Sequence, residues 1–458
     1  MQILIKNGTI VTSSDTFSSD IFISEGVIRR IEPEIEPSCC DRIIDATGNY
    51  IFPGGIDPHV HMHLPTSAGF SSDDFHTGSI AALHGGTTTL FDFVTPHRGQ
   101  NLPEALDNRI AEAEKSLIDF SFHISPVEWS DSTAQEIKEC IREGVNSFKV
   151  YMAYKNTVGL NDHDILNIMT AVGNAGGIVT IHCESGDEIE ILRNNLFNDG
   201  HTGPSFHPLS RPADLEADAV RRATEMAAGS DCPLYIVHLS AKESLPFIRH
   251  AVIRGHRIFA ETCPQYLLFD DTVYTNDFDE TAPFIISPPL RRKKDSDALW
   301  LALNEGIINT VGTDHCPFTL DQKRSGLNDF RKIPNGTGGV EHRLALLYTY
   351  GVLAGRISIN RMVDLFSTRS SRIFGLYPKK GTIMPGSDAD LVIWNPEPEK
   401  TISFKTHHQN CDNNIYEGIK TRGYAEYVLA RGRIIKDKDE IIYPETKGRF
   451  LRRRTLLL

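Results

Sequence analysis

The chain has 458 residues, of which 40% are hydrophobic and 23% are charged, which is the composition of an ordinary globular protein. Its formal net charge of −13 is spread along the sequence, which disfavours a nucleic acid or an anionic membrane surface as the main partner. No apolar stretch approaches the ~20 residues that span a bilayer and no signal-peptide pattern is present, so we expect a cytoplasmic protein with reduced cysteines.

Both ends of the chain are rich in short strand patterns. Residues 1–52 contain ILIKNGTIVT and DIFISEGVIRRIE, and residues 385–458 repeat this texture in DADLVIWNP and AEYVLARGRIIKD. We therefore predict one small β-sandwich assembled from both termini, with two unrelated flanking hairpins as the alternative. The basic run at residues 452–454 is interpreted as a solvated tail or as an arm that reaches a neighbouring subunit.

The central region, residues 53–384, alternates β-branched or aromatic runs with helical patterns, as βα units around a parallel sheet do. The predicted strands are residues 50–60, 87–94, 120–127, 147–153, 177–183, 233–240, 256–264 and 308–315. Helical patterns stand between them, for example at residues 73–86, 104–117 and 134–144.

Eight such units predict an α/β fold of the TIM type, a (β/α)8 barrel. A doubly wound sheet is disfavoured because no glycine-rich phosphate turn is present. Insertions follow strand five, at residues 185–212, and strand seven, at residues 265–294. Both insertions lie on the side of the barrel where such enzymes build their active sites.

Side chains suited to metal chemistry fall at the ends of five of these strands. They are His59, His61, Lys149, His182, His238 and Asp314. The carboxyl ends of barrel strands converge on one mouth, so these residues predict a shared metal site. Imidazole and carboxylate ligands suit zinc or a neighbouring divalent transition metal. His63 has the same strand alternation as His59 and His61, and spacing alone does not separate the three.

Lys149 is the unexpected member of this set. Two divalent ions bring about +4 of charge, against which Asp314 and a bridging hydroxide supply about −2. A lysine that has taken up CO2 as a carbamate would supply another anion with two oxygens that can bridge two metals. A lysine that points to solvent beyond the rim of the barrel is the alternative.

The sequence resembles the cyclic amidohydrolases, most closely the hydantoinase/dihydropyrimidinase family, over essentially the whole chain. The resemblance is carried by FPGGIDPHVHMH, SFKVYMAY, TIHCESGD, LYIVHLS, ETCPQYL, SPPLR, GTDHCPF and PNGTGGVEHR. It implies that His59, His61 and Asp314 hold one metal ion, that His182 and His238 hold the other, and that N6-carboxylated Lys149 bridges the two.

The same resemblance implies a reaction and an assembly. A metal-bridging hydroxide would open the ring of a cyclic ureide to an N-carbamoyl amino acid, with Asp314 as general base and then acid. Tyr154 would donate to the developing oxyanion, and Ser287 and Asn335 would bind the cyclic amide through backbone groups. Members of the family are commonly tetrameric, so we expect a homo-oligomer, a tetramer or a dimer.

Several relatives are weighed against this interpretation. Dihydroorotases are disfavoured because this chain has His63 where they carry a substrate-binding arginine. Allantoinases share the metal set and stay open, and the non-catalytic collapsin-response-mediator proteins lack ligands that this chain retains.

The sequence also departs from the family pattern. Cys183, Glu184 and Ser185 stand where Ala-Glu-Asn is usual, which puts the contacts on the substrate side in doubt. The loop MHLPTSAGFSS differs from the commonest forms, and such loops shape the pocket around the ring substituent. Leu64, Tyr151 and Val158 are expected to meet that substituent.

Overall fold

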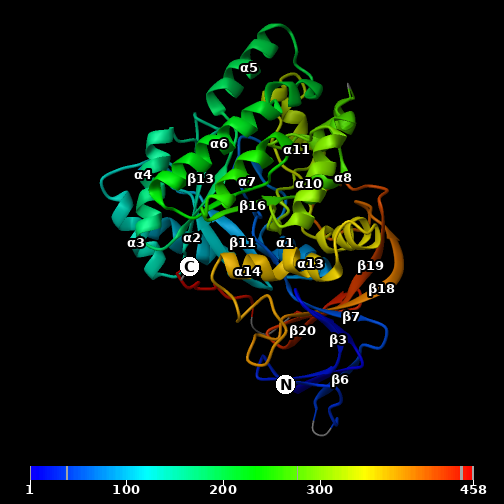
Figure 1. Cartoon of the computed structure of the whole chain (residues 1–458). Helices are drawn as coiled ribbons and strands as arrows, with labels where there is room; N and C mark the ends of the chain where they lie inside the picture. The colour runs from blue at the N-terminus through cyan, green and yellow to red at the C-terminus, as the bar shows by residue number, and fades with distance from the viewer. Residues whose placement is uncertain (1, 38–39, 276, 444–446, 456–458) are drawn as a thin grey trace.

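Eight parallel strands form the central sheet of the computed structural model, which describes residues 2–37, 40–275, 277–443 and 447–455 (Figure 1). In order of pairing they are β8 (Gly55–Asp57), β11 (Thr87–Val94), β12 (Asp119–Ile124), β13 (Ser147–Tyr151), β14 (Ile178–His182), β15 (Leu234–Ile236), β16 (Ile258–Thr262) and β17 (Thr310–Val311). A parallel bridge between Val60 and His315 joins the chain beyond β8 to the chain beyond β17. The sheet therefore closes at its carboxyl end, and the predicted barrel is confirmed.

Helices follow the barrel strands and cover the outside of the sheet. The longer ones are α1 (Phe75–His84), α2 (Leu102–Ala113), α3 (Thr133–Arg142), α4 (Asp162–Asn174), α5 (Gly186–Asn198), α6 (Ala213–Ser230), α7 (Leu245–Ile253) and α10 (Lys293–Glu305). Sequence signals set their ends: Asp74 caps the first turn of α1 in a capping box, and Gly85 follows its last residue. Among the described residues, no helix is long and apolar enough to cross a membrane.

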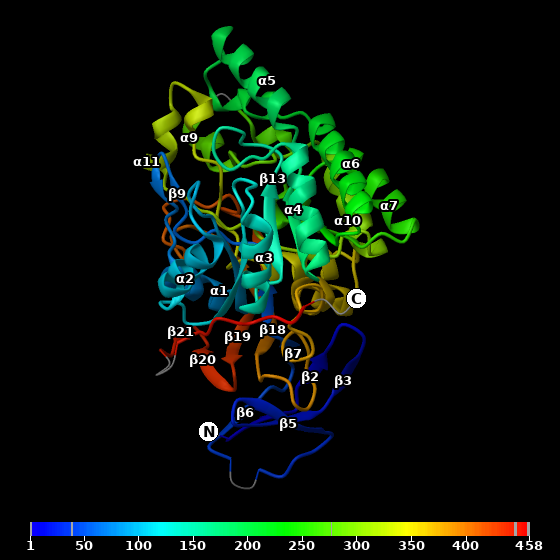
Figure 2. The ribbon, with the colours of Figure 1, turned by 90° about the vertical axis from the view of Figure 1, so that its left-hand side faces the viewer.

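The two predicted insertions carry helices on the side of the barrel where the strands end. The first contains α5, which projects at the top of the molecule (Figures 1 and 2), and the second contains α8 (Pro264–Leu268) and α9 (Phe278–Thr281). Four short α-helices lie between β17 and the C-terminal strands, namely α11 (Leu320–Lys323), α12 (Arg343–Leu346), α13 (Ile359–Val363) and α14 (Arg369–Ile373). The hairpin of β9 (Pro65–Thr66) and β10 (Gly69–Phe70) lies in the loop after β8.

The two chain ends form a two-sheet domain beside the barrel (Figure 2). One sheet has the order β5 (Val27–Glu32), β4 (Asp20–Ser24), β1 (Gln2–Lys6) and β6 (Arg42–Asp45). The other has the order β21 (Glu440–Ile441), β20 (Arg433–Asp437), β19 (Lys420–Ala430), β18 (Leu391–Thr401), β7 (Tyr50–Pro53), β2 (Thr9–Val11) and β3 (Thr16–Ser18). Buried aliphatic residues such as Ile5, Ile23 and Ile393 form its core, so the predicted sandwich is confirmed.

The first predicted barrel strand is wrong in one respect. Residues 50–60 contain two strands, because β7 pairs with β18 in the sandwich and only β8 belongs to the barrel. The chain changes sheets at Gly54, where an added Cβ would lie 2.2 Å from the Thr88 hydroxyl oxygen. Both strands are buried, so the apolar run continues through the change of sheet. The domain boundaries at residues 53 and 384 stay proposals.

Residues 448–454 run along the barrel, to which their backbone is hydrogen-bonded. Leu451 N–H donates to the Phe120 carbonyl at 2.7 Å, and Arg453 N–H donates to the Gly144 carbonyl at 2.7 Å. The Arg453 side chain is 4% exposed and donates to the Ser147 hydroxyl at 2.9 Å. The expectation of a solvated tail is therefore wrong for Arg453, because its guanidinium caps polar groups at the amino-terminal end of the barrel.

Lys380 joins the sandwich to the barrel through three carboxylates. Its Nζ lies 2.8 Å from Asp119, 3.1 Å from Asp388 and 2.6 Å from Asp390, and the lysine is 1% exposed. Substituting Lys380→Met would leave these buried charges without their common partner, so we expect a loss of about 3–5 kcal/mol in the free energy of unfolding. Thermal unfolding checks this, with exposed Lys379→Met as the control; equal melting temperatures would contradict it.

Candidate metal centre and active site

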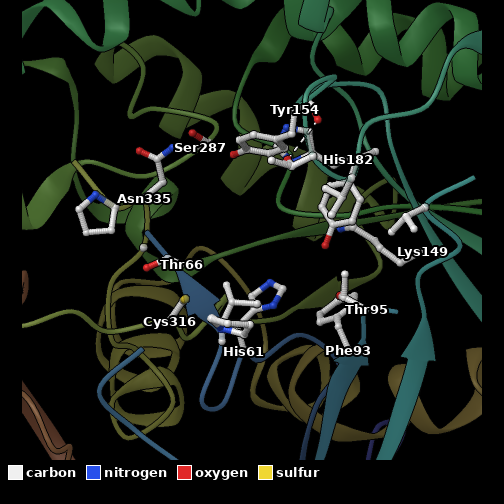
Figure 3. Close-up of a pocket in the computed structure, with 18 of the residues that line it drawn as sticks. His61, Thr66, Phe93, Thr95, Lys149, Tyr154, His182, Ser287, Cys316 and Asn335 are labelled. Atoms are coloured by element: carbon white, nitrogen blue, oxygen red, sulfur yellow. Dashed lines mark hydrogen bonds between the residues drawn. The ribbon is translucent and has the colours of Figure 1, made fainter. Parts of the chain in front are cut away.

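The structure brings all the predicted site residues to one cavity at the carboxyl end of the barrel (Figure 3). Its volume is about 930 Å³. It is lined by His59, His61, Lys149, Tyr154, His182, His238, Ser287, Asp314 and Asn335, together with residues of the surrounding loops. The strands position them because each candidate ligand lies within a barrel strand or no more than four residues after its end.

His59, His61 and Asp314 form one compact group. Asp314 Oδ1 lies 3.1 Å from His59 Nε2 and 3.2 Å from His61 Nε2, and the two Nε2 atoms are 3.2 Å apart. One ligand atom from each residue falls within 4.8 Å of the other two, so the three side chains could hold a metal ion together.

His182 and His238 form a second group beside the first. His182 Nδ1 lies 3.0 Å from His238 Nε2, and the ring centroids of His59 and His238 are 5.5 Å apart. Imidazole nitrogens that converge in this way suit a second ion. The donor set therefore fits the binuclear centre that the sequence predicts.

Two buried carboxylates orient the imidazole rings of His59 and His182. His59 Nδ1 lies 2.8 Å from Glu261, and His182 Nε2 lies 2.8 Å from Glu184. A carboxylate accepts the ring N–H, which leaves the opposite nitrogen free to face a metal ion. Glu261 also accepts from the Tyr235 hydroxyl at 2.7 Å and from His238 N–H at 3.1 Å. Sequence reasoning missed the role of Glu261, although its segment ETCPQYL was singled out.

Glu184, which agrees with the usual Ala-Glu-Asn pattern after His182, has a structural role. Its carboxylate is 1% exposed and also accepts from Arg211 at 2.5 Å. Burial opposes its charge, but Arg211 and His182 outweigh burial and lower the pKa of Glu184 to about 2. Glu184 is therefore an anion that holds His182 and Arg211 in place.

Lys149 is buried beside both groups. It is 1% exposed, and in the part of the chain that the structure describes its Nζ makes no hydrogen bond or ion pair. Nζ lies 5.2 Å from the centroid of Phe93 and 4.8 Å from that of Tyr151. Burial lowers the pKa of Lys149 to about 8, which favours the neutral amine that reacts with CO2. The alternative of a solvent-directed lysine is wrong.

Three site residues have left-handed backbone conformations. The φ angles are 60° at Tyr154, 39° at His238 and 52° at Asp314. Residues other than glycine adopt this region at a cost of about 1–3 kcal/mol each, and such residues cluster at functional sites. The surrounding barrel therefore fixes the direction of these side chains.

His63 differs from the other two histidines of its segment. Its Nδ1 lies 2.7 Å from Glu112, and its ring stacks on Phe70 with the centroids 3.9 Å apart. His63 has a φ of 50°, which takes it out of the strand alternation that His59 and His61 follow. It lines the cavity without joining the group that can hold a metal ion.

Removing the Glu261 charge should weaken metal binding without unfolding the barrel. Because Glu261 fixes the tautomer of His59, we expect Glu261→Gln to lower metal affinity by about 10–100-fold. Competition with a chelator measures this affinity. Glu341→Gln removes a half-buried carboxylate that also pairs with an imidazole, since it lies 2.8 Å from His408, and serves as the control. A wild-type affinity in Glu261→Gln would rule out this role.

Comparison with known proteins agrees with this geometry. The model of the amidohydrolase family matches residues 50–435. The chain is 41% identical over 453 residues to a D-hydantoinase of Geobacillus stearothermophilus, with 98% of this chain and 96% of that protein covered. It is 39% identical to a dihydropyrimidinase of Dictyostelium discoideum, with 98% and 90% covered. The crystal structure of dihydropyrimidinase from Brevibacillus agri matches with a TM-score of 0.98 at 39% identity and covers 100% of both chains.

Proposed function

Because the chain belongs to the hydantoinase/dihydropyrimidinase family of the amidohydrolase superfamily, we propose that it hydrolyses the cyclic amide bond of a hydantoin or a dihydropyrimidine. The product is the ring-opened N-carbamoyl amino acid. The observation that carries the proposal is the meeting of four histidines, Asp314 and a buried lysine that has no ion pair among the described residues, all in one cavity. The allantoinase and collapsin-response-mediator alternatives gain no observation in their favour.

The metal centre is proposed residue by residue. His59, His61 and Asp314 would hold one ion, His182 and His238 the other, and N6-carboxylated Lys149 would bridge them. The proposed ions are Zn²⁺, which suits imidazole and carboxylate ligands. When bound, such a pair supplies a Lewis acid and a hydroxide nucleophile near neutral pH. The carbamate would balance charge that Asp314 alone leaves uncompensated.

Asp314 is the residue proposed to accept and return the proton. Burial opposes its charge, but His59 and His61 hold the pKa of Asp314 well below its usual range, so it is a carboxylate at neutral pH. As a base it would accept the proton of the attacking water, and as an acid it would return that proton to the leaving ring nitrogen.

Tyr154 is the proposed donor to the oxyanion that develops on the attacked carbonyl. Burial raises its pKa, which keeps the hydroxyl protonated and able to donate. Its ring lies 5.2 Å from that of His182 and 5.4 Å from the Arg211 guanidinium carbon. These contacts and the left-handed backbone hold the hydroxyl in place before substrate arrives.

The cavity leaves room for more than a bare ring. Ser287 and Asn335 are the proposed backbone contacts of the cyclic amide, and both line the cavity. Leu64, Tyr151 and Val158 also line it and are the proposed contacts of the ring substituent. A volume of about 930 Å³ is at the upper end of ordinary ligand pockets, which favours a substituted substrate.

A hydrolysis panel tests the proposed function. Protein grown with ample bicarbonate and reconstituted with metal is offered dihydrouracil, 5-phenylhydantoin, allantoin and dihydroorotate. We expect turnover of at least one of the first two and not of dihydroorotate, because position 63 carries a histidine where an arginine would hold the carboxylate of dihydroorotate. Robust hydrolysis of dihydroorotate, or none of the first two compounds, would overturn the proposal.

The assembly and location are also proposals. A homo-oligomer, a tetramer or a dimer, is proposed from the family resemblance, and light scattering of the purified protein tests it. A cytoplasmic location is proposed because the described cysteines, among them Cys183 and Cys316, are all free.

A further inference from the structure

The backbone of Asn335 is left free to bind a ligand. Among the described residues, its N–H donates to no group and its carbonyl accepts from none. Asn335 lines the cavity, and Figure 3 shows it and Ser287 across the cavity from Lys149. A cyclic ureide carries alternating N–H and C=O groups, which are complementary to such a free donor and acceptor.

Lys323, the last residue of α11, holds the segments that carry Ser287 and Asn335. Its Nζ donates to the carbonyls of Ile285 at 3.1 Å, Pro334 at 2.8 Å and Gly336 at 2.8 Å. The three N–H groups of an ammonium are thus matched by three carbonyls. One of these carbonyls stands two residues before Ser287, and the other two flank Asn335.

Burying Lys323 at this position has a cost in desolvation free energy. It is 1% exposed and has no carboxylate partner among the described residues. Burial lowers the pKa of Lys323 to about 7. An apolar side chain would avoid the cost of desolvating the cation, so what the lysine contributes is its three hydrogen bonds.

Peptide geometry links these bonds to the free groups of Asn335. The Pro334 carbonyl and the Asn335 N–H belong to one trans peptide unit and point in opposite directions. In the next unit, Gly336 N–H donates to the Ile285 carbonyl at 3.0 Å, so the Asn335 carbonyl points away from Ile285. Lys323 contacts Pro334 and Ile285 directly, and both free groups of Asn335 are therefore turned away from it.

We propose that Lys323 is a positioning residue for substrate binding, which ties the Ile285 and Pro334–Gly336 segments together so that the Asn335 backbone meets the cyclic ureide. The proposal rests on the proposed function. Lys323 would affect the binding of the ring and not the binding of metal, because it contacts carbonyls beside Ser287 and Asn335 and none of the proposed metal ligands.

Steady-state kinetics of Lys323 variants test this role. Lys323→Met removes all three donors, and we expect KM for the best substrate of the panel to rise about tenfold or more. The kcat should stay within about threefold of wild type, because the bonds serve substrate and transition state alike. Metal content should be unchanged. Lys323→Gln keeps two N–H donors and should give an intermediate KM.

Lys380→Met is the matched control, since Lys380 is equally buried and lies outside the cavity. It should lower the melting temperature and leave KM at the wild-type value. An unchanged KM in folded Lys323→Met, or a fall in kcat or metal content without a rise in KM, would overturn the positioning role. If Lys323→Met does not fold, Lys323→Gln decides by the same criterion. A wild-type protein that hydrolyses no compound of the panel would overturn this proposal and the proposed function together.

Discussion

Substituting Lys149→Ala is expected to remove both the metal centre and the activity. The proposed carbamate is the only protein group that would bridge the two ions. Without it, the two ions that the four histidines would hold carry a positive charge that Asp314 alone does not balance. Losing several kcal/mol of charge stabilisation corresponds to a fall in kcat/KM of about 10³-fold or more. Metal analysis and steady-state kinetics of the purified variant measure the two effects.

Chemical rescue makes this prediction specific for a carboxylate. Acetate or propionate can enter the space left by the lysine and supply two oxygens between the ions, so we expect each to restore part of the metal content and activity. Lys155→Ala is the control, because Lys155 bonds the Leu160 carbonyl and does not line the cavity. Wild-type metal content and activity in Lys149→Ala would remove the bridging carbamate from the account.

The substitution Asp314→Asn should separate proton transfer from folding. An amide keeps the size of the side chain but accepts no proton, and general acid–base catalysis contributes about 10²–10⁴-fold to rates. We expect kcat to decrease by about 10²-fold or more, with the melting temperature close to that of wild type. Asp321→Asn, on an exposed part of α11, is the control. A kcat within threefold of wild type in Asp314→Asn would exclude Asp314 as the general base.

Much of the barrel could be predicted because its strands are short runs rich in β-branched or aromatic residues, separated by helical patterns. The second predicted strand, residues 87–94, coincides with β11, all of whose residues are buried. The change of sheet between β7 and β8 could not be predicted, because both strands are buried and periodicity carries no mark of which sheet a strand joins. Burial of Arg453 was missed for a related reason, since a short basic run usually lies in solvent.

The predicted site residues share one cavity because strand ends in a barrel meet at one mouth. The residues that contact and orient these site residues could not be predicted from the sequence. His59 and its partner Glu261 are 202 residues apart, and no local pattern records that contact. Lys323 is similar, because its partners are backbone carbonyls, which have no sequence signature.

The central claim is a pair of metal ions bridged by a carboxylated lysine in a cyclic amidohydrolase. A crystal structure of the zinc-reconstituted protein, with anomalous scattering collected at the zinc edge, tests it most directly. The account predicts two anomalous peaks, one among His59, His61 and Asp314 and one beside His182 and His238, with carbamate density on Lys149 between them. A single peak, or two peaks beside an unmodified Lys149 amine, would contradict it.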